Sequence, residues 1–80
     1  MFEQIPMLQA QLADLIAKDV RRHAHCTGFG SVWLHTVAEG QIPGTNWSLG
    51  GANYGTADER ACNDALREVI PRMQRQYRLS

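Results

Sequence analysis

The side chains with the greatest chemical potential in this 80-residue sequence are two cysteines and three histidines. His23, His25 and Cys26 lie close together and carry donor atoms that bind transition metals. On a helix, however, residues two positions apart point in directions about 200° apart, so His23 and His25 cannot hold one ion together. No second pair of ligands follows at the spacing of a zinc finger. We therefore interpret the histidines as residues that finish a helix, and we expect no metal site.

A cysteine that acts with a histidine is also the nucleophile and general base of a class of hydrolases. A catalytic cysteine acting with His35 would need a third, orienting group and an oxyanion site. The sequence gives no sign of either, so we expect no catalytic residues. Cys26 and Cys62 could instead join in a disulfide, or Cys26 could link two chains, although a reducing compartment would make both adventitious. Cys62 is most simply a small residue of the core.

The segment from Gly50 to Gly55 is the most glycine-rich part of the chain, and it leads into a predicted helix. A loop followed by a helix N-terminus can bind phosphate. This segment lacks the Lys-Ser/Thr pair of a P-loop and the full dinucleotide fingerprint. Asp58 and Glu59, in the first helical turn, would also repel an anion. We therefore interpret the segment as a strand-to-helix turn that needs positive φ, and we expect no cofactor.

Four arginines near the C-terminus form a possible basic surface. Arg60, Arg67 and Arg78 fall within about 20° of one another on an ideal helix, and Arg75 lies nearby. Three further basic residues could extend this surface: Lys18, Arg21 and Arg22. Such a surface could bind nucleic acid or an acidic protein with strong salt dependence, or it could be a solvated helix face.

Charge and composition exclude several classes of protein. Eight basic residues balance eight acidic ones, which argues against a histone-like polycation and equally against an acidic DNA mimic. The chain is 44% apolar, as a globular domain would be. It has no apolar run of about 18 residues that could span a membrane, and its first residues do not follow the pattern of a signal peptide. With only two cysteines, we expect a cytoplasmic protein that makes no membrane contact.

Hydrophobic periodicity predicts two helices to carry these groups. The first runs from about Pro6 to Ala24, because proline suits the first turn of a helix. The second follows a capping box in Thr56-Ala57-Asp58-Glu59 and ends at about Tyr77. Pro71 is expected to kink it. The buried stripe of the second helix comprises Ala61, Cys62, Ala65, Leu66, Val69, Ile70, Met73 and Tyr77.

Two strands are predicted between the helices. Phe29 to Ala38 is rich in β-branched and aromatic residues, and Asn46 to about Leu49 forms a shorter second strand. Pro43-Gly44 is placed as the centre of a type II turn between them. The element order is therefore α-β-β-α, an α+β fold of two helices packed on a short antiparallel hairpin. Residues 1–80 form one domain.

A lone two-stranded hairpin is marginal in water, and its edges would be unpaired. Two helices can cover one face of it but not both faces and both edges. We therefore predict a homodimer in which hairpins pair edge to edge or stack through the face that carries Trp33. At least one of the two tryptophans must instead fill the core of so small a chain, and the sequence leaves open which one.

The second half of the chain, roughly residues 29–80, carries a loose signature. It comprises Asn46-Trp47-Ser48-Leu49, the glycine-rich segment, a helix with Ala61, Cys62 and Ala65, and the closing Gln74-Arg75-Gln76-Tyr77-Arg78-Leu79. In these residues the chain resembles small proteins encoded by bacteriophages and mobile elements, and among them the anti-CRISPR proteins of type I systems, in particular the type I-C group. The resemblance implies a protein that binds a host CRISPR–Cas surveillance complex and keeps it from engaging target DNA. It supplies no active-site residues.

The leading hypothesis is thus a dimeric phage inhibitor that blocks a DNA-receiving or motif-recognising surface sterically. Its partner-binding candidates are aromatic, histidine and acidic side chains: Trp33, His35, Trp47, Tyr54, Glu39, Asp58, Glu59, Asp64 and Glu68. The alternative is a small nucleic-acid-binding regulator that uses a basic face of the C-terminal helix: Arg60, Arg67, Arg75 and Arg78. An enzyme is the third class, and the sequence lacks the constellation of residues that it would need.

Overall fold

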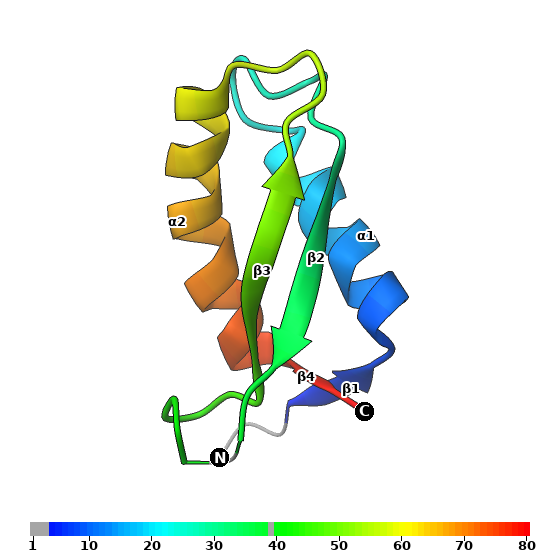
Figure 1. The fold of residues 1–80 in the computed structure, drawn as a ribbon, viewed down its shortest axis with the longest axis vertical. Coiled ribbons are helices and arrows are strands. Elements are labelled where there is room, and N and C mark those ends of the chain that lie inside the picture. Colours follow the sequence, from blue (N-terminus) through cyan, green and yellow to red (C-terminus); the bar gives the residue numbers. More distant parts are fainter. Residues whose placement is uncertain (1–3, 39) are drawn as a thin grey trace.

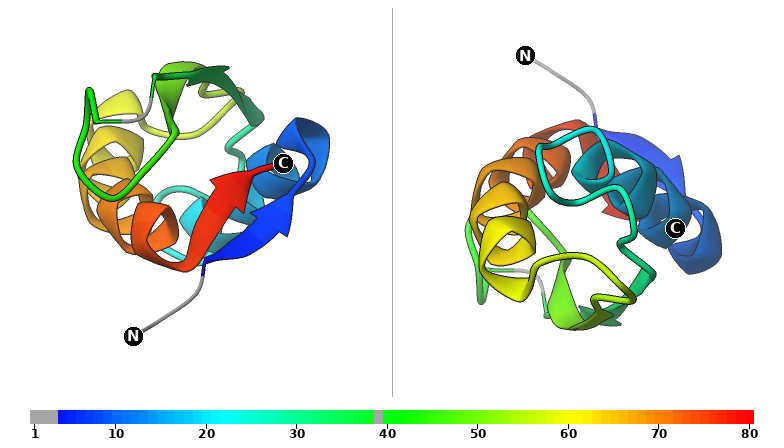
Figure 2. Two further views of the ribbon diagram at one scale, coloured as in Figure 1. Left: turned by 90° about the horizontal axis from the view of Figure 1, so that it is seen from below. Right: turned by 90° about the horizontal axis from the view of Figure 1, so that it is seen from above.

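A computed structural model describes residues 4–38 and 40–80. Its elements in chain order are β1 (Ile5–Met7), α1 (Gln9–Val20), β2 (Ser31–Thr36), β3 (Trp47–Asn53), α2 (Glu59–Gln76) and β4 (Tyr77–Leu79). Strands β2 and β3 form an antiparallel hairpin, and both helices pack on the same side of it (Figure 1). The two end views in Figure 2 show the hairpin on one side of the core and the two helices on the other. The predicted α+β class, with two helices on a hairpin, is confirmed.

A second, two-stranded sheet joins the two ends of the chain. Strand β1 pairs in parallel with β4, with Ile5 opposite Tyr77 and Met7 opposite Leu79. The prediction that a helix starts at Pro6 was therefore wrong, and α1 begins at Gln9 instead. The reason is non-local: the backbone of Tyr77–Leu79, 72 residues away in sequence, offers a partner for an extended segment that Pro6 tolerates.

The first helix also ends earlier than predicted, at Val20 rather than Ala24. The guanidinium of Arg21 reaches back across the loop and donates hydrogen bonds to the carbonyls of Phe29 and Gly30. Residues 21–25 form turns, and His25 adopts a positive φ of 66°. Because His23 and His25 lie in these turns, they do not finish the helix as predicted.

The start of α2 differs from the predicted capping box. Asp58, not Thr56, is the N-cap residue, and its carboxylate accepts a hydrogen bond from the backbone N–H of Ala61 at 2.9 Å. The helix continues through Pro71 to Gln76, and Tyr77 already has the extended conformation that starts β4. The prediction of its C-terminal limit was therefore correct to within one residue.

Strand β3 is longer than predicted, because it includes residues that we interpreted as loop. It runs from Trp47 to Asn53, and its register with β2 shifts between Trp33 and Leu34. The positive φ expected in the glycine-rich segment occurs at Gly55, where φ is 59°. The type II turn is confirmed: Gly44 has a φ of 79°, and the Thr45 N–H donates to the Ile42 carbonyl at 3.4 Å.

The core lies between the hairpin and the two helices, and Trp47 is its largest fully buried side chain. Its indole N–H donates to the Tyr77 carbonyl at 3.1 Å. The side-chain amide of the preceding residue, Asn46, donates to the Leu79 carbonyl at 2.9 Å and accepts from the Leu79 N–H at 3.0 Å. The Asn46-Trp47 pair therefore fastens the C-terminal strand to the hairpin, so two parts of the sequence signature contact each other.

Cys26 and Cys62 are free thiols, and both are fully buried in this core. Burial raises the pKa of Cys62 from 9.0 to about 11, and a hydrogen bond with Cys26 adds to the rise. The interpretation of Cys62 as a small core residue is confirmed. The predicted stripe of α2 is buried at Cys62, Ala65, Leu66, Val69 and Met73.

The raised pKa of Cys62 predicts a loss of stability in alkali. Above pH 9 the unfolded chain releases the thiol proton, whereas the folded chain retains it up to about pH 11. The free energy of unfolding should therefore fall between these pH values, by on the order of 2–3 kcal/mol from this group. Urea denaturation at several pH values between 9 and about 11 should show a steeper fall in the free energy of unfolding for the parent chain than for Cys62→Ala. Equal slopes for the two proteins would contradict the assignment.

Candidate interaction surface

The outer face of the hairpin is the side that neither helix covers (Figure 1). Alternation along β2 buries Val32 and Leu34 against the helices and turns Ser31, Trp33 and His35 outward. Trp33 is 54% exposed, which is unusual for so large an apolar side chain. The opposing residues on β3 are small or polar: Ser48, Gly51 and Asn53. The face therefore consists of one large aromatic ring with small polar neighbours.

The ring of Trp33 lies across the backbone of β3, above Gly50 and Gly51. A Cβ atom at Gly50 would lie 3.0 Å from Cδ1 of Trp33, and one at Gly51 would lie 2.9 Å from Nε1 and closer still to the six-membered ring. Only glycine leaves room for the indole at these two positions. Part of the glycine-rich segment thus serves as a seat that fixes the orientation of Trp33, which the sequence did not indicate.

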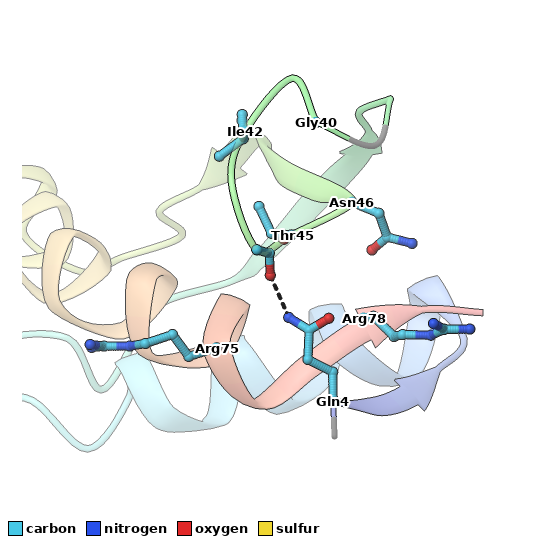
Figure 3. A pocket seen from close by; sticks show the side chains of 8 residues that line it. Gln4, Gly40, Ile42, Thr45, Asn46, Arg75 and Arg78 are labelled. Carbon is cyan, nitrogen blue, oxygen red and sulfur yellow. Dashed lines mark hydrogen bonds between the residues drawn. The ribbon is translucent and has the colours of Figure 1, made fainter. Parts of the chain in front are cut away.

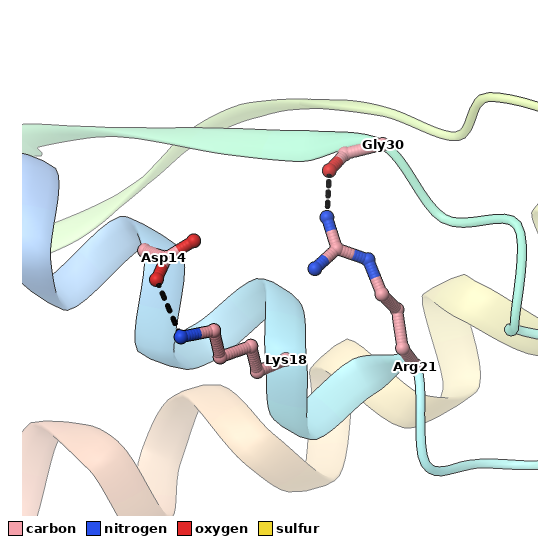
Figure 4. A network of polar contacts seen from close by, with 4 residues as sticks. All are labelled: Asp14, Lys18, Arg21 and Gly30. Atoms are coloured by element: carbon pink, nitrogen blue, oxygen red, sulfur yellow. Dashed lines mark hydrogen bonds and ion pairs between the residues drawn. The ribbon is translucent and has the colours of Figure 1, made fainter.

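The edges of the hairpin are partly capped by side chains of the same chain. The Val37 N–H donates to the Asn46 carbonyl at 2.8 Å, so the backbone groups of Val37 point towards β3. Backbone groups of successive residues point to opposite edges of a strand, so those of Leu34, three positions earlier, point to the outer edge. Gln9 of α1 donates to the Leu34 carbonyl. At the start of the strand Arg21 spans from α1 to Gly30 (Figure 4). On the opposite edge, Gln74 of α2 donates to the Trp47 carbonyl at 2.9 Å. The edge carbonyls of Leu34 and Trp47, which the prediction left unpaired, are thus bonded within the chain and are less available for edge-to-edge pairing. The face that carries Trp33 is not covered by either helix.

The three aromatic candidates differ in exposure. Trp47 is 0% exposed and cannot contact a partner, so its inclusion among the partner-binding residues was wrong. Tyr54 is half-buried, packs edge-on against Phe29 with ring centroids 6.0 Å apart, and donates its hydroxyl proton to Asn63 Oδ1 at 2.5 Å. Of the three aromatic candidates, Trp33 therefore offers the most surface to a partner, and His35 lies exposed on the same strand face.

The acidic candidates lie elsewhere. Asp58 caps α2, and Glu59, Asp64 and Glu68 are exposed along that helix rather than on the hairpin. Glu39 lies outside the described residues. The structure therefore does not gather the acidic and aromatic candidates on one surface.

The basic candidates divide between two elements. Arg60, Arg67 and Arg75 are on α2, but Arg78 is on β4, so the predicted common helix face does not extend to Arg78. Lys18 forms an ion pair with Asp14 at 3.0 Å, and Arg21 is committed to loop carbonyls (Figure 4), so neither extends this surface. Within residues 4–38 and 40–80, the ion pairs are Lys18–Asp14 and Arg72–Asp19, and neither involves Arg60, Arg67, Arg75 or Arg78.

Metal binding and membrane insertion would each require a further feature in the described part of the chain, a cluster of ligands or an apolar helix. No group of three or more His, Cys, Asp or Glu side chains there is placed to hold a metal ion. Among the same residues, no helix combines the length and apolarity needed to cross a membrane. Comparison with protein-family models, with curated proteins and with solved structures finds no match to this chain. The comparisons therefore add nothing to the geometry of the surface described above.

Proposed function

We propose that this protein is a phage-encoded inhibitor that docks on a host type I CRISPR–Cas surveillance complex and blocks target DNA binding. The observation that carries the docking part is Trp33, which is more than half exposed yet seated on Gly50 and Gly51 at the centre of an uncovered sheet face. The choice of partner rests on the resemblance in residues 29–80. The proposal places the protein in the host cytoplasm.

Trp33 has the properties of an anchor in a protein interface. Tryptophan is enriched among the residues that dominate binding energy, because it buries a large area with few rotatable bonds. The glycine seat restrains the indole before binding, so less conformational entropy is lost when a partner covers it. The surrounding Ser31, Ser48 and Asn53 can donate and accept hydrogen bonds at the rim of such an interface. The same face is suited to self-association, so the homodimer stays a prediction.

Truncation of the anchor tests the proposal. Trp33→Ala should weaken binding to a purified type I complex by about 30-fold, the loss expected for a residue that contributes about 2 kcal/mol. It should restore DNA binding by that complex in a gel-shift assay with labelled target DNA. Leu8→Ala is the matched control, because Leu8 is 62% exposed and is the N-cap residue of α1 rather than a residue of the hairpin. The proposal fails if the parent protein leaves DNA binding unchanged, or if Trp33→Ala inhibits as well as the parent.

The alternative, a regulator that binds nucleic acid through the basic residues, has weaker support. A single-stranded nucleic acid usually needs aromatic side chains on which bases stack. The described residues that line the surface beside Arg60, Arg67, Arg75 and Arg78 include no aromatic side chain. A gel shift at about 50 mM salt, where phosphate contacts are strongest, tests this alternative directly.

A further inference from the structure

A furrow made of adjoining hollows follows α2: its first hollow is lined by residues of the helix alone, and the other three also include residues of β3 or of the turn before it. It consists of four hollows of about 520, 530, 290 and 490 Å³ in series. The first and second share Asn63 and Arg67, the second and third share Pro71, and the third and fourth share Arg75 with the Gly44-Thr45 turn. We infer that this furrow, hereafter the α2 furrow, binds an extended acidic polypeptide segment. The inference concerns a second surface and does not depend on the proposed function.

Charge is the first argument for the occupant. Each hollow contains at least one of the four basic candidates, Arg60, Arg67, Arg75 and Arg78. None of the four belongs to an ion pair among the described residues. The described acidic lining residues, Glu59 and Asp64, are both in the hollow at the N-terminal end of α2. The hollow shared by Arg60 and Arg67 is therefore balanced in charge, whereas the described lining of the other three hollows has arginines and no acidic residue, so this part attracts a negatively charged ligand.

Spacing and apolar surface favour a polypeptide over a nucleic acid. Along the helix axis, Arg67 lies about 10.5 Å beyond Arg60 and Arg75 lies about 12 Å beyond Arg67, with Arg75 rotated by about 80° around the axis. An extended chain covers these distances in three to four residues, so acidic side chains at that interval match the arginines. Between the arginines, Leu49 and Ile70 line the furrow, and they suit the apolar side chains of a peptide. Bases would find no aromatic platform there among the described lining residues.

The far end of the furrow contains two arginines, Arg75 and Arg78. Gln4 lines this end and donates to the Gly44 carbonyl and to the Gln74 carbonyl, each at 2.6 Å, so it links the turn to the helix. Arg75 and Arg78 extend in opposite directions on either side of Gln4 (Figure 3). They are therefore placed for two acidic side chains along a peptide rather than for one shared anion.

Fluorescence anisotropy with labelled probes tests the inference. The probe is a 12-residue peptide with Glu at every third or fourth position and Leu or Val between, compared with a Lys version and a 12-nucleotide oligo-dT. The acidic peptide should bind, and its affinity should fall as salt increases. Arg67→Glu should weaken it at least 10-fold, and Arg75→Glu should do the same at an independent position. Circular dichroism confirms that each variant is folded.

Arg22→Glu is the matched control, because Arg22 is exposed in a separate hollow between α1 and the end of α2. It makes the same change of charge outside the furrow, so it should weaken the acidic peptide far less than Arg67→Glu. The inference is overturned if the acidic peptide fails to bind, if oligo-dT binds more tightly, or if Arg22→Glu and Arg67→Glu have equal effects. Trp33→Ala should leave peptide affinity unchanged, so this result is separate from the test of the proposed function.

Discussion

Replacement of Trp47 by alanine should destabilise the protein by about 3–5 kcal/mol, the range observed when a large aromatic side chain is removed from a core. Trp47 is fully buried, and its indole N–H also satisfies the Tyr77 carbonyl. The variant therefore loses packing and leaves a carbonyl without its donor. A loss of this size approaches the whole stability of a small domain. Urea denaturation followed by far-UV circular dichroism should show little or no folded baseline.

The matched control for Trp47 is the other tryptophan of the chain. Trp33→Ala removes the same side chain from the exposed outer face, where less apolar area is buried. It should therefore lower the free energy of unfolding clearly less than Trp47→Ala does. Trp47→Phe should fall between the two alanine variants, because it keeps most of the ring volume but loses the hydrogen bond. If Trp33→Ala proved as destabilising as Trp47→Ala, the assignment of core and surface tryptophans would be wrong.

Replacement of Gly55 by alanine should destabilise the protein by at least about 3 kcal/mol. Two costs combine at this position: a positive φ of 59°, which L side chains adopt only with strain, and a Cβ that would overlap the carbonyl oxygen of Gly28. That overlap is with backbone, so it cannot be relieved by turning a side chain. The contact joins the loop after α1 to the loop before α2, and moving one loop disturbs the other.

Gly44→Ala separates the two costs. Gly44 also has a positive φ, of 79°, but a Cβ there would meet nothing within 4 Å. Its replacement should therefore cost only the conformational strain, about 1–2 kcal/mol. Thermal and urea unfolding of the two variants should differ by the steric cost at Gly55. Equal losses of stability would show that the close approach of Gly28 and Gly55 is unimportant.

Local chemistry was sufficient to predict much of the fold. Apolar residues at helical spacing located α1 and α2, and Pro43-Gly44 specified a turn whose φ angle the structure confirms. These features are readable because they depend on residues within a few positions of one another. The α+β class and the packing of both helices on one face of the hairpin follow from the same patterns, since each element has one apolar side to bury.

The errors arise where distant segments meet. Strand β1 exists because Tyr77–Leu79 offers backbone groups to Ile5–Met7, and periodicity in the first residues cannot show a partner at the other end of the chain. Gly50 and Gly51 were interpreted as loop, although they extend β3 and seat Trp33. Glycine disfavours a strand locally, but the ring of a neighbouring strand supplies the missing packing.

The sequence by itself therefore determined the helices, the hairpin turn, the balanced charge and the candidate aromatic and basic residues, because side-chain type and spacing encode local conformation. Only the tertiary structure decided that Trp47 is buried and Trp33 exposed, that Gln9, Arg21 and Gln74 cap the hairpin, and that four arginines line adjoining hollows. Each of these depends on which face of an element meets another element. That choice is made by the packing of the whole chain, in which Asn46 and Trp47 bind the backbone of the last strand.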